Sequence, residues 1–518
     1  MLYQLLAVGA PALFVFFWLL RLTRIRDLAP VVGTVVFVGF YVPFFMFFVL
    51  PIDVVWTVPS LVWRITYWTS FVLTWFFVPF IQEYVASPFK TPRMKIRDSI
   101  HSNLKYSALL SVITLVMLVY LRFVLRSMTF KGFTNLIISL TYFYGLIFAI
   151  FLLGHGLVTV PRDCWRRAFL SKRMAQLECY AVKVYDKIQD RMDELSDLSN
   201  ATPGTGFDRS TFHQSDFSHT HLSDSEAVTA EVADASLRLH PLKIQWNETV
   251  REYAKLKALQ TCREKHSYWL RLPPGSFRTH PLLDYVLYSY VYPLLRLILA
   301  VIFGALSVLV VVSELFLGSK YSVTGIVLEK AATISPMFHL LATAVVFWYM
   351  CMCTCSSLLR SRSSFNYLTA LLPKQATHPL ALLAFLVQSC RLVIPLSYNF
   401  VSLQFSQTRF HLLFGNSIDL LPLGYYISKR YPMIVLLPVF SSIFSLHRLF
   451  YRAAYSLYLS RDRSDGSSLN TQETEDEEDD FLNEYSSSAM AEGRALLQRA
   501  MEEQNFIPPR NRYSTYHD

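Results

Sequence analysis

The sequence predicts an all-α polytopic membrane protein with about nine transmembrane helices and a cytoplasmic, coiled-coil-like helical loop. Of its 518 residues, 53% are hydrophobic and only 17% are charged. Soluble domains carry about 25% charged residues, and a mean hydropathy of +0.33 over this length indicates several membrane spans. The net charge of +10 is explained by basic residues that flank these spans, so we expect no nucleic-acid binding.

Nine apolar segments account for this hydropathy. Each is long enough to cross a hydrocarbon core of roughly 30 Å, which takes about 20 helical residues. The expected spans are 2–20, 31–50, 62–81, 106–123, 136–160, 285–316, 332–355, 379–401 and 431–446. The sixth contains Arg296 and is overlong, so we expect its first turns to lie at the cytoplasmic interface or in the cytosol.

The basic residues orient these spans. No basic residue precedes the first span, whereas Arg21, Arg24 and Arg26 follow it. This pattern predicts an uncleaved anchor with its N-terminus outside or lumenal, and nine spans then place the C-terminus in the cytoplasm. The expected organisation is a membrane domain in two parts (1–160 and 281–460), a cytoplasmic loop (161–280) and an acidic, mostly disordered cytoplasmic tail (461–518). Plasma and endolysosomal membranes both fit this layout.

The central loop contains a seven-residue apolar repeat, formed by Met174, Ala181, Ile188 and Leu195. The repeat predicts either a coiled coil or a single amphipathic helix that packs on the membrane domain. Residues 200–236 are rich in Ser, Thr, Asp and Gly, which predicts a disordered tether. A second helix at 242–265 then completes an antiparallel hairpin. In the tail, we expect a solvated acidic run at 471–480 and a short helix at 490–503.

Motifs for catalysis are missing from the sequence. It contains no P-loop, G-x-G-x-x-G, H-E-x-x-H, G-x-S-x-G or paired C-x-x-C. We therefore expect no enzyme, no cofactor and no metal site.

Polar residues at membrane depth form the candidate intramembrane site: Arg391, Asn399, Glu314, Asp53 and His155. Arg391 lies about 18 Å along its helix from Pro379, near the membrane midplane. An arginine there costs roughly 2.5–3.5 kcal/mol, which calls for a compensating contact.

Two interpretations of Arg391 stay open at this point. In the functional one, the guanidinium faces an anionic ligand or an acid in a polar cavity, and Glu314, Asp53 and Asp419 are the nearest acids by depth. In the structural one, it forms a salt bridge or caps carbonyls that Pro395 frees.

The cysteines in "CMCTC" (351–355) do not share one helix face, because alternate residues point about 200° apart. Metal binding is therefore disfavoured. Since this span ends towards the cytosol, Cys353 and Cys355 are candidates for reversible palmitoylation, and simple packing of small apolar side chains is the alternative.

Several stretches together resemble the limb-region-1-like family, also called the lipocalin-interacting membrane receptor (LIMR) family. They are "VLPIDV" (49–54), "YWTSFVLTWFFVPFIQEY" (67–84) and "LGHGLVTVPRDCWR" (153–166). "CRLVIPLSYNF" (390–400) and the tail "AEGRALLQRAMEE" (491–503) are similar to one branch, limb region 1 domain-containing protein 2. This chain is shorter than members of that branch, and its central loop has less coiled-coil sequence.

The resemblance implies nine spans, an outside N-terminus, a large cytoplasmic loop after the fifth span and no reaction. Family members are described as receptors for small secreted carriers, as lysosomal participants in vitamin export and as signalling-associated proteins. It marks ten residues as architectural signature positions: Asp53, Trp75, Pro79, Gln82, Pro161, Arg162, Trp165, Arg391, Pro395 and Asn399.

These observations predict a multi-pass receptor-like or adaptor-like protein. We expect residues 161–280 and the tail to bind cytosolic signalling or trafficking proteins, since the outside loops are short. The alternative is a transporter or channel-like protein with a polar midplane site around Arg391.

Overall fold

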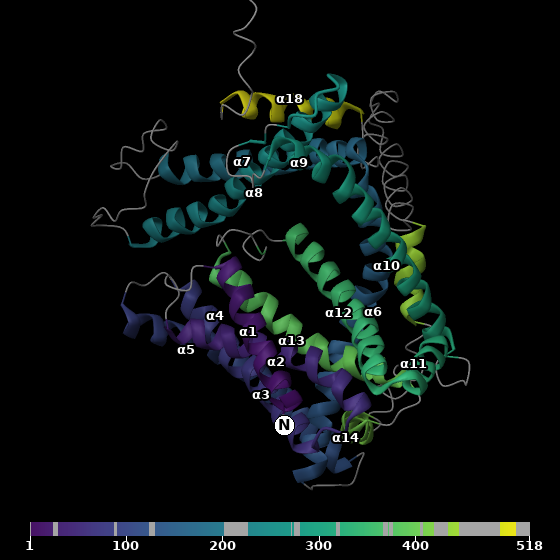
Figure 1. Ribbon diagram of the computed structural model, residues 1–518. Helices are drawn as coiled ribbons and strands as arrows, with labels where there is room; N and C mark the ends of the chain where they lie inside the picture. The colour runs from purple at the N-terminus through teal and green to yellow at the C-terminus, as the bar shows by residue number, and fades with distance from the viewer. Residues whose placement is uncertain are drawn as a thin grey trace, which may run out of the picture. The chain divides into compact units, whose positions relative to one another are not determined.

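Every regular element that the structure describes is a helix, which confirms the predicted all-α class. The computed structural model describes residues 2–23, 30–87, 91–123, 130–200, 226–270, 272–273, 280–316, 322–365, 371, 377–404, 408–418, 434–444 and 487–503. The elements in Figure 1 are α1 (Leu2–Leu22), α2 (Pro30–Val55), α3 (Ser60–Val72), η2 (Leu73–Phe77), α4 (Val78–Ala86), α5 (Pro92–Phe123), α6 (Phe130–Ala168), α7 (Leu170–Asn200), α8 (Glu226–Glu264), α9 (Pro281–Val286), η4 (Leu287–Val291), α10 (Tyr292–Leu315), α11 (Val323–Ile334), α12 (Pro336–Phe365), α13 (Pro379–Ser402), α14 (Arg409–Ile418) and α18 (Ser487–Glu503). Both η elements are π-helical turns inside longer helices.

Seven helices among the described residues are long and apolar enough to cross a membrane. They are Pro30–Val55, Ser60–Ala86, Pro92–Tyr120, Gly132–Ala168, Pro281–Leu315, Pro336–Arg360 and Pro379–Ser402. Two shorter apolar helices, Gly9–Leu22 and Ile434–Ile443, lie where the first and ninth spans are expected. The number of nine crossings stays a prediction.

The chain divides into two compact units. We call residues 1–163 with 299–449 the membrane unit, and residues 164–298 with 450–518 the hairpin unit. In the membrane unit, α2 packs against α1, α12 and α13. α13 is the most enclosed candidate span, with 72% of its apolar stretch buried, whereas α5 has 0% buried. Helix α13 therefore belongs to the core, and α5 lies at the outside.

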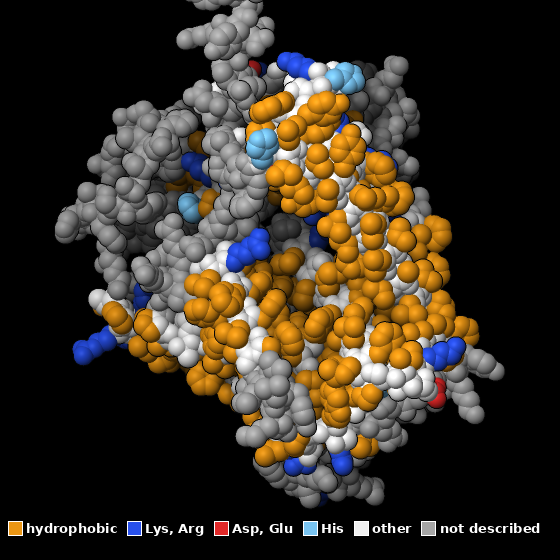
Figure 2. Space-filling model, viewed as in Figure 1, with side chains coloured by type: hydrophobic (Ala, Val, Ile, Leu, Met, Phe, Trp, Pro, Cys, Tyr) orange, Lys and Arg blue, Asp and Glu red, His pale blue; other side chains and the backbone are white. Residues whose placement is uncertain are grey.

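Hydrophobic side chains also cover much of the surface. Figure 2 shows a broad hydrophobic face, and exposed residues of the membrane unit include Val301, Val308 and Leu341. A soluble monomer rarely exposes so large an apolar surface. Contact with the lipid tails of a bilayer explains such a surface.

Prolines inside the helices create links between helices. A helical proline has no N–H, so the carbonyl four residues earlier loses its intrahelical donor. In α2, Pro51 frees the carbonyl of Phe47, and Trp348 Nε1 of α12 donates to it at 2.7 Å. Three more prolines follow the same rule: Pro43 (Gly39 carbonyl, Cys390 Sγ, 3.3 Å), Pro161 (Leu157 carbonyl, Ser307 Oγ, 2.6 Å) and Pro293 (Ser289 carbonyl, Arg263 Nη2, 2.9 Å). In each case the freed acceptor bonds a side chain from another helix.

A glycine in α6 allows close packing within the membrane unit. A Cβ atom at Gly156 would lie 2.3 Å from the carbonyl oxygen of Cys353 on α12. Membrane helices commonly use small residues to bring two backbones this close. Gly156, which belongs to the stretch "LGHGLVTVPRDCWR" (153–166) noted in the sequence, therefore has a packing role.

The hairpin unit is built on α7 and α8, which lie side by side (Figure 1). They are antiparallel, because Glu178 contacts Tyr253 while Tyr185, further along α7, contacts the earlier Trp246. The four apolar repeat residues of α7 are all buried, namely Met174, Ala181, Ile188 and Leu195. The predicted apolar stripe is confirmed, whereas supercoiling of the two helices stays a prediction.

The structure corrects the predicted boundary of the tether. Helix α8 begins at Glu226 rather than near residue 242, so residues 226–236 are helical. The segment "EAVTAEVADA" is rich in alanine and glutamate, which favour helix strongly. Residues 201–225, the rest of the expected tether, lie outside the described residues.

The short helix expected in the tail is present as α18, which packs against α7 and α8. Residues 461–486 and 504–518, with the acidic run, lie outside the described residues.

Candidate functional site

The five predicted polar residues do not form one site. Glu314 and Asn399 contact each other, whereas Asp53, Arg391 and His155 each have different surroundings. His155 Nδ1 lies 3.5 Å from the Thr159 hydroxyl one turn later on α6. The candidate intramembrane site is therefore divided into three separate contacts, made by Glu314 with Asn399, by Asp53 and by Arg391. His155 lies apart from them.

Glu314 and Asn399 link α10 to α13. The Asn399 amide Nδ2 donates to Glu314 Oε1 at 2.5 Å. Both side chains are buried, and Glu314 Oε2 has no hydrogen-bond partner among the described residues. Beside them, the hydroxyls of Ser313 and Thr324 are 2.6 Å apart. This enclosed group is suited to holding α10, α11 and α13 together.

Asp53 connects the end of α2 to two other helices. Its carboxylate accepts from the backbone N–H of Val58 (2.7 Å), from Trp63 Nε1 of α3 (3.2 Å) and from the backbone N–H of Phe410 in α14 (3.1 Å). Phe410 lies in the first turn of α14, where a negative charge is favoured by the helix dipole. With three donors and almost no exposure, Asp53 has an architectural role.

Arg391 contacts aromatic rings, and no carboxylate among the described residues pairs with it. Its guanidinium carbon lies 4.7 Å from the Trp75 ring centroid and 5.3 Å from that of Tyr144. Both distances are within the range of a cation–π interaction. Among the described residues Nε has no hydrogen-bond partner, although the Tyr106 phenol lies nearby. The structure does not bring Arg391 to Glu314 or Asp53, two of the three acids considered for it, and Asp419 lies outside the described residues.

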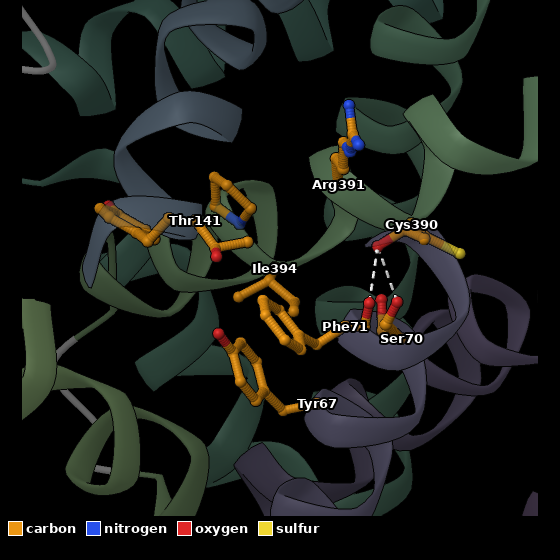
Figure 3. Close-up of a pocket in the computed structure, with 10 residues that line it drawn as sticks. Tyr67, Ser70, Phe71, Thr141, Cys390, Arg391 and Ile394 are labelled. Atoms are coloured by element: carbon orange, nitrogen blue, oxygen red, sulfur yellow. Dashed lines mark hydrogen bonds between the residues drawn. The ribbon is translucent and has the colours of Figure 1, made fainter. Parts of the chain in front are cut away.

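Local helix chemistry places Trp75 against this arginine. Trp75 lies in the π turn η2, and Pro79 follows it. Pro79 cannot donate to the Trp75 carbonyl, which favours a wider turn here. In Figure 3 the Arg391 side chain extends away from Tyr67 and Phe71, which line a cavity of about 10 Å³ beneath it. That cavity has room for about one water molecule.

A second, much larger cavity shares Phe71 and Thr141 with the small one. It measures about 860 Å³, lies between η2, α5 and α6, and includes Trp75 and Tyr144 in its lining. Most of the lining is apolar, with hydroxyls from Ser107, Ser111 and Thr141. Ligand pockets of small molecules commonly have such a volume and composition. Arg391 therefore stacks on two walls of a cavity that could hold an apolar or amphiphilic molecule.

The cysteines differ in accessibility. Cys353 is fully buried against the Gly156 region of α6, whereas Cys355 is partly exposed. Burial makes Cys353 a poor acyl acceptor, because the enzyme that attaches the acyl group has to reach the sulfur; palmitoylation of Cys355 stays a prediction. No group of three or more metal-ligating side chains occurs in the described part of the chain.

The hairpin unit contains a polar cluster that the sequence did not reveal. Glu178 on α7 accepts from Arg494 Nε at 3.0 Å, from Arg494 Nη2 at 3.2 Å and from the Tyr253 hydroxyl at 3.0 Å. The Glu178 side chain is only 4% exposed, whereas that of Arg494 is 57% exposed. Burial raises the pKa of Tyr253, and the neighbouring Glu178 raises it further, so the phenol keeps its proton and donates it.

Glycine next to this arginine allows the tail helix to approach α7 closely. A Cβ atom at Gly493 would lie 1.9 Å from the Glu178 carbonyl oxygen, so a side chain there would force the two backbones apart. The signal that could have found this contact is the Gly-Arg pair in the tail stretch that resembles the family.

Comparisons with known proteins agree with the resemblance noted in the sequence. Residues 1–447 match the family described as LMBR1-like membrane protein. The chain is 30% identical over 181 residues to the G-protein coupled receptor-associated protein LMBRD2 of Caenorhabditis briggsae (28% of each chain). It is 26% identical to the LMBR1 domain-containing protein 2 homolog of Drosophila melanogaster (66% of this chain, 56% of the relative) and 23% identical to the receptor-associated protein LMBRD2 of Homo sapiens (74% and 63%).

The chain thus spans less than two thirds of the length of these curated relatives. No solved structure matches it. Because the family match runs through nearly all of the membrane unit and the whole central loop, the resemblance found in the sequence is confirmed: the chain belongs to the LMBR1-like membrane protein family.

Proposed function

We propose that this integral membrane protein is a receptor-associated adaptor whose hairpin unit binds cytosolic signalling or trafficking proteins. The observation that carries the proposal is that loop and tail residues build one compact unit of their own, around α7, α8 and α18. The names of the relatives, which are receptor-associated proteins in several species, support the same class. The proposal includes no reaction and no cofactor.

In this proposal the hairpin unit lies in the cytosol, and the charge pattern supports that side. Arg166, Arg167, Lys172 and Arg173 follow the apolar part of α6 directly, and such basic flanks favour the cytoplasmic side. The N-terminus is then outside or lumenal.

Two partly exposed side chains of α7 are candidates for contact with a partner protein. Tyr180 and Met192 are 44% and 36% exposed on α7. Tyrosine and methionine are enriched at protein interfaces, because they supply apolar area together with adaptability. Lys183 and Asp190, also exposed on α7, provide a comparison at polar positions.

Proximity labelling from a ligase fused to the tail tests the proposal. We expect Tyr180→Glu combined with Met192→Glu to remove a reproducible set of cytosolic partners. The matched control, Lys183→Glu combined with Asp190→Lys, preserves net charge and keeps that set. The proposal is wrong if the partner set is unchanged by the first pair at equal expression in the same membrane, and unchanged again when residues 226–264 are replaced by a Gly/Ser linker.

A second candidate function follows from the cavity of about 860 Å³. Its apolar lining fits an amphiphile better than a polar solute. The transporter-like alternative therefore becomes a carrier or sensor of an anionic amphiphile that binds against Trp75 and Tyr144, the two rings on which Arg391 stacks. A photoreactive fatty acid provides the test. We expect it to label α5 and α6, to lose labelling with Arg391→Leu and to keep it with Arg64→Leu, which removes an exposed arginine of α3. Equal labelling of all three proteins contradicts this function.

A further inference from the structure

The tail helix α18 is held on α7 by a small and specific set of residues. Gly493, Leu497, Ala500 and Met501 are buried, and their spacing of three and four residues puts them on one face. The rest of α18 is mostly exposed. The contact therefore consists of one apolar stripe and the arginine beside it.

The receiving surface belongs to both helices of the hairpin. The α18 stripe packs with Met174 and Ala181 of α7 and with Val250, Tyr253 and Ala254 of α8. Glu178, in the middle of this surface, is the acceptor for Arg494. The surface thus recognises two adjacent positions of a helix. The first has a small residue, which lets the helix backbone approach α7, and the second has an arginine, which pairs with Glu178.

Helix α18 gains stability from this surface. It has 17 residues, and most of the stability of a helix in a protein comes from packing of its apolar face. Residues 445–486 separate it along the chain from the last described helix of the membrane unit. The Arg494 side chain is largely exposed, so water competes with Glu178 for its guanidinium group. These features are typical of a docked segment that can exchange with another helix of the same pattern.

We propose that the α7–α8 surface under α18 is a helix-binding groove that the chain's own tail covers. Its partner class is an amphipathic helix with the pattern small–Arg–x–x–Leu–x–x–Ala–Met, in which the arginine pairs with Glu178. This inference rests on the proposed function, since it names how the hairpin unit receives one kind of partner. Displacement of α18 makes the groove available.

The test uses the full chain in lipid nanodiscs and a fluorescent synthetic peptide of residues 486–504, with binding followed by anisotropy. Gly493→Leu in the chain disables its own α18 but leaves the groove intact. We expect the peptide to bind this variant at least tenfold more tightly than the wild-type chain, in which the groove is covered. A chain that ends at Tyr485 provides the same comparison without a substitution in α18.

Charge exchange tests the recognition itself. A peptide with Arg494→Glu should bind at least tenfold more weakly, and Glu178→Arg in the Gly493→Leu chain should restore its binding. A peptide with Arg499→Glu, which changes an exposed position, should bind like the original.

Two results would overturn the inference. If the peptide binds none of the chains, the surface is not a helix-binding groove; if it binds wild type and both variants equally, α18 does not cover it. Both readouts are independent of the partner set tested with Tyr180 and Met192, so failure of the inference and failure of the proposed function can be told apart.

Discussion

The carbonyl that Pro161 frees in α6 allows a sharp test of how this bundle is held together. Ser307 Oγ of α10 donates to the Leu157 carbonyl at 2.6 Å, in a buried position. If Pro161 is the reason that this carbonyl needs a donor, then Pro161→Ala, which restores an N–H four residues later, makes Ser307 redundant. The perturbation is therefore Ser307→Ala, made in both backgrounds.

The magnitude follows from the single bond involved. Hydrogen bonds between membrane helices contribute about 0.6 kcal/mol on average and up to about 1.7 kcal/mol, and an orphaned buried acceptor moves the value towards the upper end. We expect Ser307→Ala to cost about 1–2 kcal/mol in the wild-type background and less than about 0.5 kcal/mol in the Pro161→Ala background. Ser307 also contacts the Tyr349 hydroxyl, and because that contact is lost in both backgrounds it cancels in the cycle.

The assay is unfolding of the purified protein in mixed micelles by SDS titration, with thermal melting in detergent as a second readout. All four proteins are compared: wild type, each single variant and the double variant. An equal cost of Ser307→Ala in both backgrounds, within about 0.3–0.5 kcal/mol, would refute the reasoning that the proline creates the need for the serine.

Three further predictions concern the membrane unit. Gly156→Val should destabilise the protein by about 1–3 kcal/mol through overpacking against α12, whereas Gly304→Val, which has nothing within 4 Å of the new Cβ atom, should be near neutral in the same thermal assay; a reversed order contradicts the packing. Glu314→Gln should keep its acceptor oxygen and melt near wild type, while Glu314→Leu orphans the amide opposite and should cost about 1–3 kcal/mol; equal melting of the two variants would sink this account. In cells fed alkyne-palmitate, Cys355→Ser should reduce labelling and Cys353→Ser should not, because Cys353 is buried; the opposite pattern would show that burial does not protect Cys353.

Hydropathy located the membrane helices well, because a bilayer fixes the length and composition of each span locally. The seven-residue repeat of α7 was equally informative, since Met174 and Ala181 lie on one face whatever that face contacts. The start of α8 was placed too late, because the polar residues before 242 concealed alanine and glutamate that extend the helix to Glu226. Local composition therefore predicted the presence of each helix better than the residues at which it begins and ends.

The candidate site was harder to predict, because its contacts depend on how each helix is rotated. Depth along the chain suggested an acid for Arg391, yet the helix faces bring it Trp75 and Tyr144 instead. The Glu178–Arg494 contact joins residues far apart in the chain, and hydropathy holds no information about such a pairing.

The central claim, that the hairpin unit receives protein partners, is tested most directly by site-specific photocrosslinking in cells. A photoreactive phenylalanine analogue replaces Tyr180 on α7 in one protein and Val116, an exposed residue of α5, in the other. The adaptor account predicts discrete protein adducts from position 180 that are missing from position 116. An absence of protein adducts at position 180, or the same adducts from both positions, would contradict it.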